Sequence, residues 1–253
     1  MLPARAYLAL LIIGLVIAGI ILFFPKSTDR QPQSSSNETS SFERGVLRFT
    51  SPKKSAHYES NTPAHEAVLA APPLNVVVDF NFDLSAKSTL EITFEGKNYA
   101  TAPASVDENK LALRAPMDPN APDGLYTVSY NACWPDNTCH DGSFQFGIDR
   151  RVSRDFTDER GKKNVTIKLT NTQFAPSSVR VSAGTTVTWV NDDAIEHYVN
   201  TDSHPAHTFF PAQNSKLLKK ADTFSLTFDS VGAYPYHCSA HEATMRAMIV
   251  VEE

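Results

Sequence analysis

The chain of 253 residues is poor in several features that mark common functions. Its ten glycines form no glycine-rich segment that could cradle a phosphate, which argues against a nucleotide-binding loop. Its net charge of −5 provides no basic surface for nucleic acid, so no nucleic-acid partner is expected. No Ser-His-Asp arrangement or pair of carboxylates stands out for hydrolysis, and no supersecondary unit repeats along the sequence. These absences remove nucleotide binding, nucleic-acid binding and hydrolysis from the leading hypotheses.

Long hydrophobic runs are scarce too, and the one that stands out lies at the N-terminus. From Tyr7 to Phe24 no residue is charged, and a helix of that length would extend about 27 Å, close to the hydrocarbon core of a bilayer. No Ala-x-Ala site closes the run, so residues 1–26 are predicted to be an uncleaved membrane anchor rather than a cleaved signal peptide. Either interpretation exports the remaining chain. We expect a single-pass protein of the cell membrane whose other domains lie on the extracytoplasmic (periplasmic or outer) side.

Cysteine is also rare, with three residues in all. Cys133 and Cys139 enclose a turn-rich segment, and in an oxidising compartment such a pair can close a small disulfide. The alternative is a Cys-x5-Cys metal clip, but the segment offers few further ligands. The sequence therefore predicts a disulfide there and leaves Cys238 for other chemistry.

The rest of the sequence reads as an all-β protein with two β-sandwich domains. Residues 27–45 are rich in Ser, Gln, Asn and Thr and are predicted to be a flexible tether. In residues 46–149 and 164–253, short alternating runs are separated by Pro, Asp and Asn, and the charged segment 150–163 is taken as a linker. The predicted strands include residues 74–80, 89–94, 110–113, 126–130 and 144–148, then 165–169, 179–181, 187–190, 224–228 and 248–251.

The strongest signal lies near the C-terminus, where Cys238, His241 and Met245 place a thiol, an imidazole and a thioether within eight residues. Together with His197 they make the two-His, one-Cys, weak-axial-Met set of a blue-copper site. Zinc is a weaker alternative because a thioether is a poor fourth ligand for it, and a merely buried cysteine does not account for the spacing. His237 should face away from Cys238 in an extended segment, and we expect it to be structural.

These residues and their framework resemble a family. Residues 164–253 are similar to a small cupredoxin of the plastocyanin and amicyanin type. The similarity runs in order through Phe174-Ala175-Pro176, Val181 to Asn191, His197, Phe228, Gly232 and Tyr236-His237-Cys238. It implies a Greek-key sandwich that holds one type 1 copper through His197, Cys238, His241 and Met245. Tyr198 stands where many relatives carry Asn, so different hydrogen bonding around the thiolate is expected.

The first domain, residues 46–149, resembles a CopC-type copper-resistance domain. The similarity is carried by residues 57–64, 68–73, 122–130 and 140–146. That family holds Cu(II) through an N-terminal His amine and an Asp-x-His pair. Here Ser55 stands at the position of the first His, and Asp136 and His140 are four residues apart. The resemblance implies the fold of the family, whereas these departures argue against its Cu(II) site.

A second, less specific pattern is the loop that carries His204 and His207, three residues apart. These imidazoles could bind a second metal ion, with Asp202 and Glu196 available as oxygen donors. The plain alternative is a polar loop with two solvated histidines, and base rates for such motifs favour it.

Two functional hypotheses follow. The first is one-electron transfer by a copper that cycles between Cu(I) and Cu(II), with His241 as the surface exit and the anchor holding the carrier near membrane redox enzymes. The second is extracytoplasmic copper binding, buffering or delivery. A copper enzyme would need additional His-rich sites, so we expect a protein that is not an enzyme. Its expected partners are the membrane and a redox protein or a copper-trafficking protein.

Overall fold

A computed structural model describes residues 47–253, and the regular secondary structure of this part of the chain is almost entirely β-strand, so the all-β class is confirmed. The anchor predicted at residues 1–26 and the tether at 27–45 lie outside the described residues. Within residues 47–253, no helix combines the length and the apolar character needed to cross a bilayer. Each of the strand segments expected from the sequence overlaps a strand of the structure.

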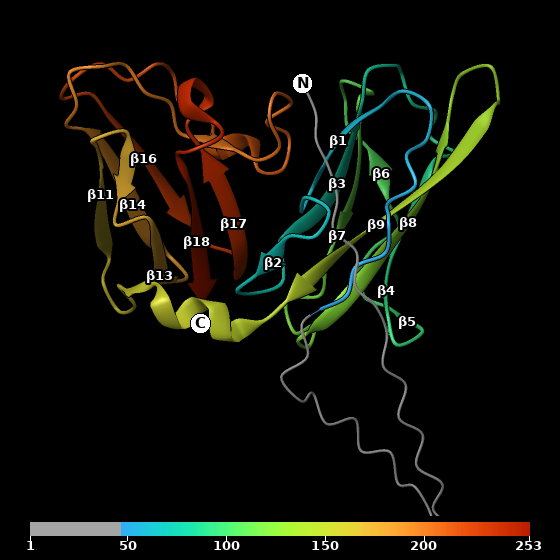
Figure 1. The fold of residues 1–253 in the computed structure, drawn as a ribbon, viewed down its shortest axis with the longest axis horizontal. Coiled ribbons are helices and arrows are strands. Elements are labelled where there is room, and N and C mark those ends of the chain that lie inside the picture. Colours follow the sequence, from blue (N-terminus) through green and yellow to red (C-terminus); the bar gives the residue numbers. More distant parts are fainter. Residues whose placement is uncertain (1–46) are drawn as a thin grey trace, which may run out of the picture. The chain divides into compact units, whose positions relative to one another are not determined.

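The first sandwich consists of two sheets (Figure 1). One has the order β1-β3-β7-β6, with β1 (Tyr58–Thr62), β3 (Asn75–Phe80), β7 (Ala112–Pro116) and β6 (Ser105–Val106). The other has the order β2-β9-β8-β4-β5, with β2 (Val68–Leu69), β9 (Cys139–Ile148), β8 (Gly124–Cys133), β4 (Thr89–Phe94) and β5 (Lys97–Asn98). Alternate residues of β8 point inward, and Tyr126, Val128 and Tyr130 are buried in the core, as a period of two requires.

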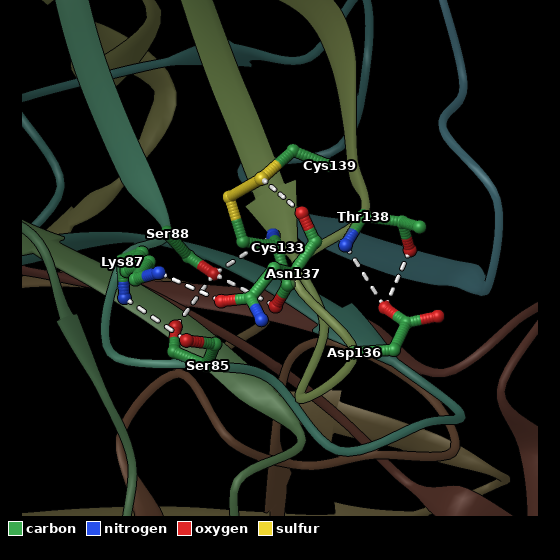
Figure 2. Close-up of a disulfide and its surroundings, with 8 residues drawn as sticks. All are labelled: Ser85, Lys87, Ser88, Cys133, Asp136, Asn137, Thr138 and Cys139. Carbon is green, nitrogen blue, oxygen red and sulfur yellow. Dashed lines mark hydrogen bonds between the residues drawn. A yellow bond between two sulfur atoms is a disulfide. The ribbon is translucent and has the colours of Figure 1, made fainter.

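A disulfide joins β8 and β9 where the two strands enter the turn of their hairpin (Figure 2). Cys133 and Cys139 are directly opposed across the two strands, and their Cα atoms are 4.0 Å apart. The turn between them contains Asn137 in the left-handed region, a conformation that Asn tolerates, and the Lys87 ammonium donates to its side-chain oxygen at 2.7 Å. The cysteine pair therefore crosslinks the hairpin instead of clipping a metal.

The second sandwich also has two sheets, and both contain parallel pairs. One has the order β12-β11-β14-β16, with β12 (Gln173–Ala175), β11 (Asn164–Thr170), β14 (Thr185–Asn191) and β16 (Thr223–Phe228). The other has the order β10-β13-β18-β17-β15, with β10 (Thr157–Asp158), β13 (Ser178–Ser182), β18 (Arg246–Glu252), β17 (Gly232–His237) and β15 (Asn200–Thr201). Trp189 and Tyr236 are among the largest buried side chains of this core, with ring centroids 5.6 Å apart.

The segment expected to be a linker, residues 150–163, carries secondary structure of its own. It begins with a 3-10 helix, η1 (Arg150–Asp155), whose first turn is capped by the Asp149 carboxylate through the Arg151 N–H at 3.0 Å. Strand β10 follows and pairs in parallel with β13. The second sandwich therefore begins at β10, several residues before the expected boundary at Asn164. Two further 3-10 helices, η2 (Pro211–Gln213) and η3 (Ser239–His241), lie in its loops.

Candidate metal centre

Three of the four residues expected to hold copper converge at one end of the second sandwich. The Cys238 Sγ lies 3.6 Å from the Nδ1 atoms of both His197 and His241. His197 and Cys238 are fully buried, His241 is half-buried, and all three ligand atoms lie within 4.8 Å of one another. Metal–sulfur and metal–nitrogen bonds of about 2.3 and 2.0 Å sum to more than this 3.6 Å separation, so one ion can bond the sulfur and either nitrogen. Met245, the fourth residue, is buried in the same core.

A short 3-10 turn explains why the Cys-x-x-His spacing works. Strand β17 ends at His237, and η3 starts directly after Cys238. The His241 N–H donates to the Cys238 carbonyl at 2.8 Å, and in such a turn the side chains at positions i and i+3 eclipse. The loop then closes where the Cys238 N–H donates to the Met245 carbonyl at 2.9 Å. The main chain thus fixes the thiol, the second imidazole and the thioether residue as one unit.

His197 reaches the site from the segment that follows β14. Its main chain is tied to Leu218 by a reciprocal pair of hydrogen bonds of 3.0 and 2.9 Å. Its ring donates from Nε2 to the Asp193 carboxylate at 2.9 Å, which leaves Nδ1 facing the Cys238 sulfur. This is the usual way in which an outer carboxylate fixes the tautomer of a ligating imidazole.

Asp193 was not identified from the sequence, although it precedes His197 by only four residues. Burial disfavours its charge, but hydrogen bonds from the Thr172 N–H, the His197 ring and the Asn171 N–H together hold the pKa of the Asp193 carboxyl below its usual value. The carboxylate therefore holds the His197 ring and the Asn171–Thr172 turn at the same time. Asn191 supports it by accepting from the Asp193 N–H at 2.9 Å.

The sulfur of Cys238 receives one main-chain hydrogen bond, from the Tyr198 N–H at 3.3 Å. Because the donor is a peptide group, this contact does not depend on the side chain at position 198. Altered hydrogen bonding was expected from Tyr198, but this main-chain donor is in place.

A second group of imidazoles lies close to the first. His204 and His207 are joined by His237, and their ligand atoms lie within 4.8 Å of one another. The Nε2 atoms of His207 and His237 are 3.2 Å apart, and the Ser239 hydroxyl is 3.0 Å from the same His207 nitrogen. His237, expected to be structural, belongs to this cluster of imidazoles and not to the group around Cys238.

Of the two acidic residues expected to be available to this loop, Asp202 contacts the cluster and Glu196 does not. Asp202 accepts from His237 Nδ1 at 2.7 Å and from the Arg246 guanidinium at 2.8 Å. Glu196 is exposed and takes no part in the cluster. Burial and the neighbouring His237 and His204 rings lower the pKa of His207 to about 4, so its ring is neutral at pH 7.

The loop that carries this cluster is held by a carboxylate of the first sandwich. Asp79 accepts from the Ser203 hydroxyl at 2.6 Å, the Thr208 hydroxyl at 2.5 Å and the Ser60 hydroxyl at 2.8 Å. Arg114 donates to the Thr208 carbonyl at 2.6 Å. Burial raises the pKa of Asp79 above its ordinary value, although the three hydroxyls and Arg114 act in the opposite direction.

The residues of the CopC-type Cu(II) site do not gather. His57 bonds Asn81 at 3.1 Å, and its ring stacks on Phe82 with centroids 4.8 Å apart. Asp136 accepts from Thr138 in the hairpin turn. In the described part of the chain, neither of the two groups of potential metal ligands includes His57, Asp136 or His140.

Both family resemblances are confirmed by comparison with known proteins. Residues 162–252 match the copper binding proteins of the plastocyanin/azurin family, and residues 58–149 match the CopC domain. Amicyanin from Paracoccus denitrificans is 32% identical over 88 residues, which are 35% of this chain and 65% of that protein. Plastocyanin from Scenedesmus fuscus is 36% identical over 84 residues, 31% of this chain and 86% of that protein. A solved structure of a reduced amicyanin variant shares 30% identity, covers 35% of this chain and 82% of that one, and has a TM-score of 0.30.

Proposed function

The chain belongs, through residues 162–252, to the plastocyanin/azurin family of copper-binding proteins, and from this we propose that it transfers single electrons through one type 1 copper. Copper bound at such a site supplies a centre that accepts and releases one electron. Cys238 would be the thiolate ligand, His197 and His241 the imidazole ligands, and Met245 the weak axial ligand.

The observation that supports this proposal best is the buried convergence of one thiol and two imidazoles, each nitrogen 3.6 Å from the sulfur. Main-chain hydrogen bonds hold the Cys238 loop, and Asp193 holds the His197 ring, so the ligands have little freedom to move. A ligand set that stays in place suits one-electron chemistry, because little rearrangement is then needed when the charge of the ion changes.

The difference in exposure between the ligands indicates the route of the electron. His197 and Cys238 are fully buried, whereas His241 is half-buried beside the exposed Ala240 and Ala243. We take the His241 edge as the surface where a redox partner docks. We further propose that residues 1–26 anchor the protein to the cell membrane and keep both sandwiches on the extracytoplasmic side, near such a partner.

A second candidate function, copper buffering or delivery, is favoured by the CopC match at residues 58–149 and by the additional imidazole cluster. In that case the same ligands would store and release the ion. We rank it second because the most complete ligand set is the buried one around Cys238, which is built to retain an ion.

The two functions are separated by cycling the full chain, in detergent, between its oxidation states in the presence of a Cu(I) chelator. After one equivalent of Cu(II) is loaded, a carrier should lose its thiolate absorption on reduction and recover it fully on reoxidation, over many cycles. Transfer of the copper to the chelator within the first cycles would refute the electron-transfer proposal and support delivery.

A further inference from the structure

We propose that His204, His207 and His237 form a second metal site, separate from the type 1 set, that binds Cu(II). This goes beyond the electron-transfer proposal, because the site shares no ligand with it and adds His237 to the two loop histidines.

The three rings are spaced so that their nitrogens can bind one metal ion. The Nε2 atoms of His207 and His237 are 3.2 Å apart, less than the roughly 4.0 Å spanned by two metal–nitrogen bonds. His204 lies farther out, within 4.8 Å of the other ligand atoms, and is exposed. It can therefore turn inward on the ion while the two inner rings stay in place.

His237 is prepared for a ligand by its surroundings. Its ring is fully buried, and its Nδ1 donates to Asp202 at 2.7 Å, which turns Nε2 toward His207. Arg246 in turn holds the other oxygen of Asp202 at 2.8 Å. A carboxylate behind a ligating imidazole fixes its tautomer and the orientation of its ring.

The first sandwich fixes the loop that carries the other two rings. Ser203 and Thr208 flank the loop histidines, and both hydroxyls donate to the buried Asp79 on β3. Arg114 on β7 donates to the Thr208 and Phe209 carbonyls at 2.6 and 2.9 Å. The CopC-like domain thus supports a metal site with its hydrogen bonds, although its own expected ligands do not gather.

The imidazole donor set favours copper. Imidazoles suit Cu(II) and Zn(II), and at a given site Cu(II) binds more tightly than Zn(II). The outermost of the three rings, His204, borders a cleft of about 840 Å³, whose lining also includes Asp202 and Ser203. Because Cys238 and His237 are consecutive residues, one peptide unit would link the two metal sites. Two Cu(II) ions so placed should interact magnetically.

The test is a Cu(II) titration of the full chain in detergent, followed by visible absorption and electron paramagnetic resonance. We expect two tight equivalents, one with the thiolate band and one without it. His204→Ala and His207→Ala should each weaken the colourless equivalent at least about tenfold and leave the thiolate band intact. His140→Ala, which removes an exposed histidine from the β8–β9 hairpin, is the matched control and should change neither.

Two further samples keep this test independent of the electron-transfer proposal. Cys238→Ala should lose the thiolate band and retain the colourless equivalent. In the wild type, Cu(II) at the second site should broaden the resonance of the first, whereas Zn(II) at the second site should not. The proposal is overturned if no equivalent without the thiolate band binds, if that equivalent is insensitive to both loop variants or equally sensitive to the control, or if both equivalents bind and no broadening occurs. A colourless equivalent that binds without any thiolate band would instead contradict the electron-transfer proposal alone.

Discussion

Removing the Asp193 carboxylate should weaken copper binding without touching a ligand. In the proposed metal-bound state His197 would use Nδ1 for the ion, so its Nε2–H would depend on Asp193 as acceptor, which lies 2.9 Å from Nε2 of this fully buried ring. Leaving a buried donor unpaired costs about 1–3 kcal/mol, which at 1.4 kcal/mol per tenfold is a loss of about 5- to 140-fold. Loss of an outer partner of a metal ligand typically costs about 10- to 100-fold, in agreement with this range.

Asp192→Ala provides the matched control. Asp192 is the neighbouring carboxylate, but it is half-exposed and pairs with the half-exposed Lys168 at 3.1 Å, an interaction worth at most about 1 kcal/mol. We expect its removal to change copper affinity less than about twofold. Asp193→Asn, which keeps one acceptor oxygen, should fall between the control and Asp193→Ala.

The assay is competition for Cu(I) against a chelator of known affinity, with wild type and the three variants measured side by side. Since Asp193 also accepts from the Asn171 and Thr172 N–H groups, at 2.7 and 2.9 Å, urea unfolding of each metal-free variant records the loss of fold stability separately. Equal affinity losses in Asp192→Ala and Asp193→Ala, or a loss below threefold in Asp193→Ala, would refute the reasoning.

Three further predictions concern the axial ligand, the disulfide and the buried carboxylate. Met245→Leu should retain the thiolate band and raise the midpoint potential in a redox titration, since losing a weak donor disfavours Cu(II); an unchanged potential would exclude the thioether. Replacing Cys133 and Cys139 together by Ser should lower the free energy of unfolding by about 2 kcal/mol in urea and leave the band unchanged; a weakened band would contradict this. The pKa of Asp79 is raised in the folded protein above the ordinary value of 3.8 that it has in the unfolded chain. Asp79 therefore contributes fully to folding stability at pH values below 3.8, where its carboxyl is protonated. This contribution is lost as the pH rises through the raised pKa. The advantage in unfolding free energy of wild type over Asp79→Asn should therefore fall as the pH rises from about 4; a constant or rising difference would contradict the assignment.

Alternation of apolar residues was enough to predict most of the strands, and the deviations have local causes. Strand β4 has the predicted bounds, Thr89–Phe94. The run expected at 110–113 is shifted, because Lys110 has a φ of +60° and its N–H bonds Asp107 in a turn, so β7 begins only at Ala112.

Strand β17 was not predicted, since Gly232 and Pro235 interrupt its pattern. Pro235 is tolerated because its carbonyl faces the side of β15, where it accepts from the Asp202 N–H. β15 pairs only as far as Thr201 with Tyr236, so no strand on that side requires an N–H from position 235.

The metal ligands could be proposed from the sequence because Cys238 and His241 are three apart, which one 3-10 turn brings together. The residues that orient them could not. Asp193 is selected by the turn after β14, and His237 meets His207 only because β17 packs beside a loop that Asp79 holds from the other sandwich. Such contacts depend on tertiary structure, and spacing along the chain carries no sign of them.

The most direct test of the central claim is the visible spectrum of the full chain with one equivalent of Cu(II), with Cys238→Ala as the paired sample. A type 1 site predicts an intense thiolate band in the wild type that is absent from the variant. No such band at any ratio of copper to protein, or a band of equal intensity in Cys238→Ala, would contradict the account.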